Sequence, residues 1–276
     1  MPERFDNPGS MFPPSWSDPS GSRSAKPRTK GLTMVIDKGT GISAFRDLLE
    51  LASPYMDICK LGFGTAALYP TAQLRQKLEL ARAYGLQIMP GGTFFEIALR
   101  TTPASQYMET ISQLGFTAVE ISDGTFPLSQ KERREAILSG LACGLIVYTE
   151  FGKKDANYRA EKEELLQTLA ADLDAGASHV IVEARESGTV GVFDRNGNID
   201  QQFVLDVTEA AQELGSKLIW EAPKKEQQVH LIQALGSNVH LGNIAYSDVL
   251  SVETLRRGLR GDTAARFATR SAAPCE

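Results

Sequence analysis

His179-Val180-Ile181-Val182-Glu183 is a short β-like apolar run that ends on a charged residue, and the chain repeats this pattern. The other runs of this kind are Val35-Ile36-Asp37, Ile58-Cys59-Lys60, Val119-Glu120, Val147-Tyr148-Thr149-Glu150 and Leu218-Ile219-Trp220-Glu221. A buried strand that ends on a charge is unfavourable unless the charge meets a metal, a partner or a ligand. The repeated pattern therefore predicts a ring of charges at one mouth of a barrel, where (β/α)8 proteins carry their active sites.

Strand and helix patterns alternate from Gly31 onward. The candidate strands are residues 32–37, 56–61, 86–89, 117–121, 145–151, 179–184, 217–221 and 239–244. A glycine follows each of several helical patterns, where a left-handed helix end is expected: Gly85, Gly115, Gly144, Gly176, Gly215 and Gly236. Eight alternating β and α patterns favour an α/β fold with a closed parallel sheet, the (β/α)8 TIM barrel. A doubly wound open sheet is the alternative, and no GxGxxG fingerprint supports it.

The length and composition fit one soluble globular domain. The chain has 276 residues, 42% of them hydrophobic and 23% charged, which is enough for one (β/α)8 barrel. We expect the barrel to span residues 26–264 and a short tail to span residues 265–276. Residues 1–25 are rich in Pro, Ser and Gly and lack periodicity, so we expect a disordered extension.

The charge and the cysteines exclude several classes of protein. The net charge of −5 argues against nucleic acid or an anionic membrane as a partner, because both require a concentrated basic surface. No apolar stretch reaches the length of a membrane span. The three cysteines lack CxxC spacing, so neither a disulfide framework nor a zinc site is indicated. We expect a cytoplasmic protein.

The two-residue period of a strand predicts which side chains share the barrel interior. If the charged residue of each strand end points inward, so does the residue two positions earlier. The expected pairs are Val35 with Asp37, Ile58 with Lys60, Ala118 with Glu120, Tyr148 with Glu150, Ile181 with Glu183, Ile219 with Glu221, and Leu241 with Asn243. The polar members lie last in their strands, at the catalytic face of such a barrel.

Five carboxylates and one lysine would then converge on one cavity. Like charges this close raise one another's pKa values steeply, and a divalent cation relieves the repulsion. Oxygen ligands without a His or Cys cluster suit Mg2+. The candidate metal ligands are Asp37, Glu120, Glu150, Glu183 and Glu221. The alternative for each carboxylate alone is a salt bridge that closes the barrel.

Basic and glycine-rich segments follow the same strand ends. The basic residues include Lys38, Lys60, Lys153, Lys154 and Arg185, and the turns include Ser187-Gly188 and Gly242-Asn243. Several cations that face a metal-binding carboxylate ring suit a polyanionic substrate, and backbone N–H groups of such turns can bind phosphate oxygens. The alternative is that the lysines lie in solvated loops.

Eight motifs in order resemble the phosphosulfolactate synthase (ComA-type) family, which also includes plant heat-stress-associated proteins. They are LTMVIDKG at 32–39, DICKLGFGT at 57–65, PGGTFFE at 90–96, GFTAVEISDGT at 115–125, TEFGKK at 149–154, DAGASHVIVEARESG at 174–188, WEAPKKEQQ at 220–228 and NIAYSDVLSVETLRRGLRGDT at 243–263. The resemblance implies a (β/α)8 barrel and Mg2+-dependent addition of sulfite to phosphoenolpyruvate. The implied product is (2R)-phospho-3-sulfolactate, an early compound of coenzyme M biosynthesis.

For that reaction we expect Mg2+ on Glu120, Glu150 and Glu183, with Asp37 and Glu221 as supporting or alternative ligands. Protonation of carbon 2 needs a positioned acid; we favour Lys154, with Lys60 and Lys153 as rivals. The substrate-binding candidates are Lys38, Arg185, Ser187, Gly188 and Asn243. The family also suggests a homo-oligomer, with a trimer as the expected form.

Three other functions stay open at this point. Lys60 could form a Schiff base as in an aldolase-like barrel, if burial lowers its pKa. The barrel could instead be a non-catalytic protein of heat tolerance. It could also be a related enzyme that acts on another phosphorylated small acid.

Overall fold

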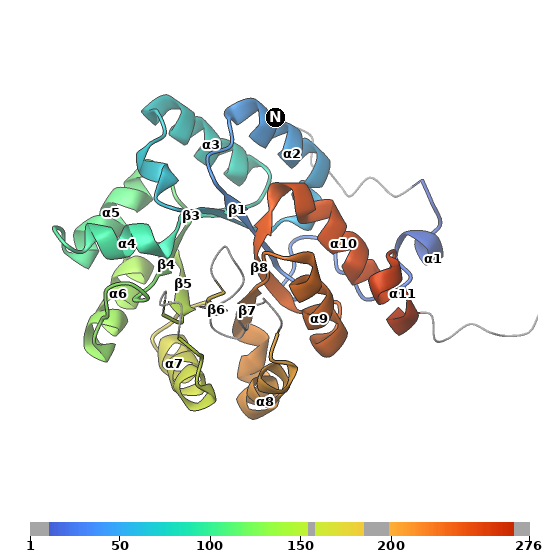
Figure 1. Cartoon of the computed structure of the whole chain (residues 1–276). Helices are drawn as coiled ribbons and strands as arrows, with labels where there is room; N and C mark the ends of the chain where they lie inside the picture. Colours follow the sequence, from blue (N-terminus) through green and yellow to red (C-terminus); the bar gives the residue numbers. More distant parts are fainter. Residues whose placement is uncertain (1–10, 154–157, 185–198, 268–276) are drawn as a thin grey trace, which may run out of the picture.

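The computed structural model of the chain describes residues 11–153, 158–184 and 199–267. Its strands form one parallel eight-stranded sheet in the order β3-β2-β1-β8-β7-β6-β5-β4, with the helices around it (Figure 1). The strands are β1 (Thr33–Asp37), β2 (Ile58–Leu61), β3 (Gln87–Pro90), β4 (Ala118–Ile121), β5 (Ile146–Phe151), β6 (His179–Val182), β7 (Leu218–Glu221) and β8 (His240–Ala245). The predicted (β/α)8 TIM barrel is confirmed, and each strand lies within two residues of its expected bounds.

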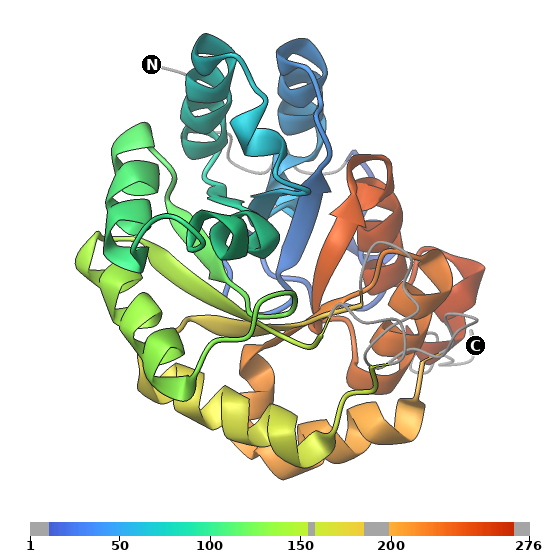
Figure 2. The ribbon, with the colours of Figure 1, turned by 60° about the vertical axis from the view of Figure 1, so that its left-hand side comes forward.

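Helices enclose the strands from every side seen in Figures 1 and 2. They are α1 (Pro14–Ser17), α2 (Ile42–Ala52), α3 (Thr71–Ala83), α4 (Gly92–Ala98), α5 (Ala104–Leu114), α6 (Gln130–Ala142), α7 (Lys162–Asp174), α8 (Gln201–Ala211), α9 (Lys225–Leu235), α10 (Val249–Arg257) and α11 (Gly261–Phe267). Short 3-10 turns are η1 (Ser53–Tyr55), η2 (Thr65–Ala67), η3 (Gln212–Lys217) and η4 (Tyr246–Asp248). Since α5 already links β3 to β4 around the outside, α4 is an additional helix in that connection.

Glycines follow five of the helices at the positions that the sequence predicts. Gly85, Gly115, Gly144, Gly176 and Gly236 all take positive φ values, which a glycine adopts without a Cβ clash. The sixth predicted position differs. Gly215 lies inside the turn η3, and Gln212 takes the positive φ of 50° directly after α8.

Two apolar layers sit on opposite faces of the strands. The inner layer fills the barrel and comprises Leu32, Met34, Ile58, Met89, Ala118, Tyr148, Ile181 and Ile219. The outer layer lies between strands and helices and includes Phe45 of α2, Leu78 of α3 and Leu165 of α7. Five of the predicted interior partners therefore face inward as expected. Val35 and Leu241 belong to the outer layer instead.

The strands β3 and β4 meet at a seam in the ring. In the described part of the chain no strand register joins these two strands. At its amino-terminal end the seam is closed by Thr117, whose N–H donates to Ile88 O at 3.1 Å. The Thr117 side chain also accepts from the Ile88 N–H at 2.9 Å. Side-chain and loop contacts thus complete the barrel here.

Residues 11–31 lie against the amino-terminal end of the barrel. Arg23 is an ion-pair partner of Glu253 at 2.9 Å, with side chains 2% and 5% exposed. Lys26 donates to carbonyl groups of Ser53 and Met56 at 3.2 and 2.7 Å. These contacts could not be predicted, since residues 11–31 lack apolar periodicity. The segment is held by cationic side chains that contact carboxylate and carbonyl groups of the barrel.

The same segment contains the short helix α1, which has no buried residue. Trp16 of α1 is 68% exposed, and Phe12 before it is 65% exposed.

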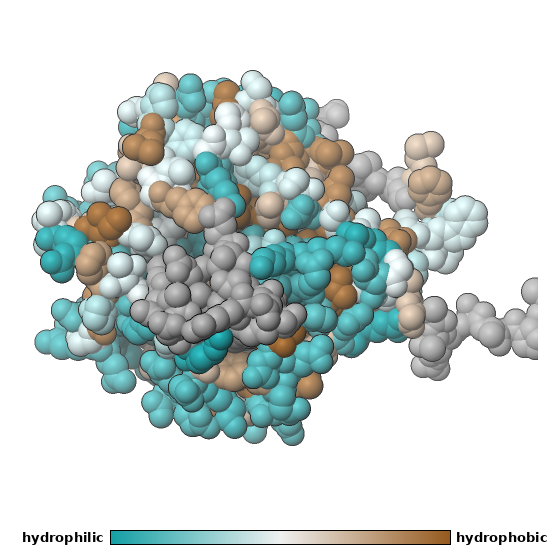
Figure 3. Space-filling view, viewed as in Figure 1, coloured by the Kyte–Doolittle hydropathy of each residue, from teal (hydrophilic) through white to brown (hydrophobic). Residues whose placement is uncertain are grey.

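Apolar side chains on the outer surface form separate patches among hydrophilic ones (Figure 3). Among the barrel residues that the structure describes, the most exposed large apolar side chain is that of Leu68, at 82%. No helix of the described residues is both long and apolar enough to cross a membrane.

Candidate active site

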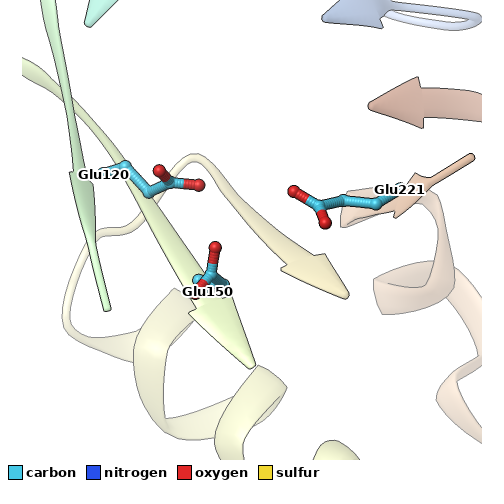
Figure 4. A group of neighbouring side chains, drawn as sticks. All are labelled: Glu120, Glu150 and Glu221. Carbon is cyan, nitrogen blue, oxygen red and sulfur yellow. The ribbon is translucent and has the colours of Figure 1, made fainter. Parts of the chain in front are cut away.

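Three buried glutamates converge at the carboxyl ends of the strands. Glu120 and Glu150 are the next-to-last residues of β4 and β5, and Glu221 is the last residue of β7. Their exposed fractions are 1%, 3% and 1%. One carboxylate oxygen from each lies within 4.8 Å of the others, and the three carboxyl groups point toward one another (Figure 4). We call Glu120, Glu150 and Glu221 the glutamate triad.

Lys60, from the end of β2, places its ammonium group in the triad. Its Nζ donates to Glu120 Oε1 at 3.0 Å and to Glu221 Oε1 at 2.8 Å. Burial alone would lower the pKa of Lys60, but the charges of Glu120, Glu221 and Glu150 outweigh it and raise that pKa well above its ordinary value. Lys60 is therefore a charged amine. A Schiff-base role, which needs a neutral amine, is opposed by this environment.

Backbone N–H groups orient two of the triad carboxylates. Gly92 N donates to Glu120 Oε2, and Ala184 N donates to Glu221 Oε2 at 3.0 Å. In each carboxylate one oxygen thus faces the backbone and the other faces Lys60. Backbone groups that follow β3 and β6 therefore fix the orientation of the Glu120 and Glu221 carboxylates.

Glu150 is oriented through a hydroxyl group. Ser122, directly after β4, places its Oγ 2.7 Å from Glu150 Oε1 and 2.6 Å from Glu96 Oε1. Glu96 lies in α4 and is 2% exposed. The sequence reasoning missed Ser122 and Glu96, although both lie in the motifs PGGTFFE and GFTAVEISDGT. Glu96 sits in a helix, so a search for charged strand ends could not find it.

Arg133 of α6 is a second group that the sequence reasoning missed. Its guanidinium donates to Asp172 of α7 and, at 3.0 Å, to the backbone oxygen of Glu150. It also pairs with Asp123 at 3.1 Å. Asp123 in turn is 3.3 Å from the amine of Lys153. Arg133 therefore ties the end of β5 to the loop after β4. Arg133, Glu150 and Lys153 line a cavity of about 430 Å³.

Glu183, expected as a direct metal ligand, lies beside the triad rather than in it. It follows β6, is 4% exposed, and shares the inward phase of Ile181. Gly152 lies so close that a Cβ there would be 2.9 Å from Glu183 Cβ. Glu221, expected as a supporting ligand, takes the third position of the triad.

Asp37 does not face the barrel interior. It belongs to a polar cluster between β1 and the helices, where Lys77 of α3 and Tyr69 donate to it. Burial acts to raise the pKa of Asp37, but Lys77 and the N–H groups of Thr40 and Gly39 outweigh it and lower that pKa. The expected interior position was wrong because β1 is buried on both faces, so no alternation in its sequence marks the inner one.

Asn243 stands at an irregularity of β8. Between Thr33 and Val35 the register on β8 moves from Leu241 to Ile244, so β8 contains one extra residue. Asn243 has a φ of 54°, is 7% exposed, and its Oδ1 has no hydrogen-bond partner among the described residues. The expected interior position of Leu241 was wrong, because Leu241 belongs to the outer layer, and the extra residue breaks the two-residue alternation on which its pairing with Asn243 relied.

The other predicted site residues have different placements. Lys38 lies over the ring of Phe63, with its Nζ 5.6 Å from the ring centre. Phe63 is 55% exposed and has a φ of 56°. Lys154, Arg185, Ser187 and Gly188 lie outside the described residues.

The fold and the triad together define a class of protein. The chain is a (β/α)8 barrel with an acidic, lysine-containing candidate active site at the carboxyl ends of its strands. The profile of the family described as (2R)-phospho-3-sulfolactate synthase (ComA) matches residues 21–262. The chain belongs to that family.

Named relatives agree with this assignment. The chain is 41% identical over 244 residues to the phosphosulfolactate synthase of Methanothermobacter thermautotrophicus, covering 87% of this chain and 94% of the relative. It is 37% identical over 243 residues to the phosphosulfolactate synthase of Bacillus subtilis, covering 87% and 95%. The Protein HEAT-STRESS-ASSOCIATED 32 of Arabidopsis thaliana is 21% identical over 262 residues, covering 85% and 88%.

Among solved structures, the type I 3-dehydroquinate dehydratase of Clostridium difficile has a TM-score of 0.55 and 14% identity. The match covers 84% of this chain and 94% of that chain. At this identity the similarity concerns the barrel fold alone.

Proposed function

We propose that this protein is a Mg2+-dependent phosphosulfolactate synthase, which adds sulfite to phosphoenolpyruvate and forms (2R)-phospho-3-sulfolactate. The observation that carries the proposal is the glutamate triad at the strand ends of a chain in this family. Buried carboxylates in this number are costly without a cation, and an anionic substrate could not approach them unless their charge were offset.

The residues present fit a hard divalent cation. The triad supplies three carboxylates, and with the Lys60 ammonium the group carries a net charge of −2. The ligand atoms are all oxygens, as Mg2+ prefers. We assign the cation to Glu120, Glu150 and Glu221, with Glu183 beside them. Mg2+ held there would act as a Lewis acid on the substrate carboxylate.

The chain's own groups account for the remaining requirements of the reaction. The sulfur lone pair of sulfite forms a bond to carbon 3, the electron pair of the double bond moves toward the carboxylate, and carbon 2 then takes a proton. Lys60 is poorly suited as the proton donor, because two ion pairs hold its proton. We therefore propose Lys154 as the donor, with Lys153 beside it as the alternative.

Phosphate and sulfonate binding is assigned to groups around the mouth. We propose Lys38, Arg185, Ser187 and Gly188 as contacts of these anions. Asn243 supports the assignment, since its buried amide oxygen has no partner among residues 11–153, 158–184 and 199–267, and such a group is costly unless a ligand or water satisfies it.

The test is consumption of phosphoenolpyruvate with sulfite, followed with and without Mg2+. We expect turnover that stops in excess chelator, and we expect Glu150→Gln and Glu221→Gln to lower kcat by about 100-fold or more. The Mn2+ affinity of each variant, measured without substrate, shows which carboxylates bind the cation directly. Glu221→Gln should weaken it more than Glu183→Gln does. Full activity of the wild type in excess chelator would refute the cation dependence.

A non-catalytic role in heat tolerance is the second candidate, favoured by the similarity to the plant relative. The intact triad with its lysine argues against loss of catalysis. If the purified protein consumed no phosphoenolpyruvate with sulfite and Mg2+, this second candidate, or an enzyme for another phosphorylated small acid, would replace the first.

We further propose a cytoplasmic location and a homo-oligomer, with a trimer as the expected form. Light scattering of the purified protein measures the oligomeric mass directly. The product could enter coenzyme M biosynthesis or leave as sulfolactate, and the genes that accompany this one in a genome would distinguish these routes.

A further inference from the structure

The additional helix α4 contacts two triad carboxylates at once. It follows β3 and lies beside β4 (Figure 1). Its first residue, Gly92, donates a backbone N–H to Glu120. Its fifth residue, Glu96, reaches Glu150 through the hydroxyl group of Ser122. One short helix therefore contacts the triad carboxylate of β4 directly and that of β5 through Ser122.

The approach of α4 to β4 is close. A Cβ on Gly92 would lie 2.5 Å from Ser122 Cβ and 3.1 Å from Glu120 Cγ. Real Cβ atoms do not come so near a neighbour, so this position requires glycine. Ser122 is itself fully buried. The Ser122 and Glu120 side chains therefore lie directly against the backbone of α4.

Glu96 is fixed by bonds of its own. Its Oε2 accepts the N–H groups of Thr125 and Phe126, both at 2.7 Å. Its Oε1 lies 2.6 Å from Ser122 Oγ. The carboxylate thus anchors the loop after β4, and Ser122 relays the position of Glu96 to Glu150.

We infer that Glu96 and Ser122 are positioning residues, which hold the Glu150 carboxylate in the orientation that completes the triad. The inference rests on the proposed function for its link to cation binding. Groups that orient metal ligands in this way commonly change metal affinity or activity by about 10- to 100-fold when they are removed.

The decisive variant is Ser122→Ala. It removes the hydroxyl relay but keeps both backbone bonds of Glu96. The matched control is Ser237→Ala, which removes a buried hydroxyl that donates to Arg256 O at 2.7 Å, at the opposite end of the barrel. Glu96→Gln is the conservative variant, because its amide oxygen can accept the Thr125 and Phe126 N–H groups. Its amide nitrogen can donate to Ser122 Oγ, which leaves the serine proton for Glu150.

Three measurements are made on the full chain: Mn2+ affinity without substrate, the urea midpoint, and the crystal structure around Glu150. We expect Ser122→Ala to lose about tenfold in Mn2+ affinity, with a urea midpoint no lower than that of Ser237→Ala. Glu96→Gln should bind Mn2+ nearly as the wild type does. Equal Mn2+ affinity in Ser122→Ala and the wild type would overturn the inference, as would an equal loss in Ser237→Ala.

The crystal structure keeps the two proposals apart. If the wild type binds no Mn2+, the proposed cation site fails, and the orientation of Glu150 in Ser122→Ala still decides the inference. A turned carboxylate supports positioning by Ser122. An unchanged carboxylate overturns it.

Discussion

Replacing Lys60 with methionine would leave three buried glutamates without the ammonium that now joins two of them. The Nζ lies 3.0 Å from Glu120 and 2.8 Å from Glu221, and the side chains of all three residues are at most 6% exposed. Methionine retains most of the length of the lysine stem, so the change removes the charge with little loss of packing.

The magnitude follows from these distances. At an effective dielectric constant of about 20, each ion pair contributes about 6 kcal/mol of attraction, which the desolvation of the buried ions offsets in large part. Removal of one partner from a buried ion pair costs about 3–5 kcal/mol. We expect the free energy of unfolding of Lys60→Met to fall by about that amount in the presence of a chelator.

If the proposed cation site exists, a divalent cation should replace the lost charge. At about 100 times its dissociation constant, a ligand that binds the folded state adds about 2.7 kcal/mol of stability. The gain from Mg2+ should be larger in Lys60→Met than in the wild type, because the triad then carries its full charge of −3 in place of −2.

The assay is urea unfolding of the full chain in chelator and in Mg2+. Lys77→Met is the matched control, since it removes a buried lysine that pairs with Asp37 away from the triad. Both variants should have a lower free energy of unfolding than the wild type in chelator. Addition of Mg2+ should raise the free energy of unfolding of Lys60→Met by more than it raises that of the wild type, and should not do so for Lys77→Met. An unchanged stability of Lys60→Met in chelator would refute the electrostatic reasoning, and an equal restoration of both variants would refute the placement of the cation.

Two further predictions concern the opposite end of the barrel. Burial and the neighbouring charges lower the pKa of His179 in the folded protein from 6.5 to about 3 and that of His240 to about 4. The contribution of the two neutral imidazoles to stability is therefore complete above pH 6.5. It is lost as the pH falls from 6.5 toward these folded values. At about pH 5 each histidine should lower the free energy of unfolding by about 2 kcal/mol. His240→Gln should therefore reduce the difference in urea stability between about pH 7 and about pH 5. An undiminished difference would contradict this prediction. Deletion of residues 1–24 removes Arg23 from buried Glu253 and should lower the Tm by roughly 5 °C or more, whereas deletion of residues 1–10 should not; equal Tm values for the two deletions would show that Arg23 contributes nothing.

Much of the fold could be predicted because its signals are local. The apolar run at 179–183 and the glycine at 176 each specify a strand or a helix end without reference to distant residues. The face of a strand on which a given side chain lies could not always be predicted. Where both faces are buried, as in β1, periodicity carries no information, and Asp37 was placed in the wrong layer.

The site could be predicted only in part for the same reason. Strand ends located Glu120, Glu150, Glu221 and Lys60, which the structure brings together. The choice between Glu183 and Glu221 as the third triad member depends on side-chain reach across the barrel. Glu96 is a helical residue that approaches the triad only because α4 folds over β4.

At the seam between β3 and β4, residues of the candidate active site also hold the wall of the barrel together. At the carboxyl end this junction is held by Gly92 on Glu120 and by Glu96 on Ser122, while Thr117 holds the other end. In many enzymes polar active-site groups weaken the fold, and their replacement increases stability. Here the replacement of Glu120 would loosen the wall of the barrel as well as the proposed cation site. Amide hydrogens of β3 and β4 should then exchange faster than those of β7 and β8, so that opening begins at the catalytic mouth.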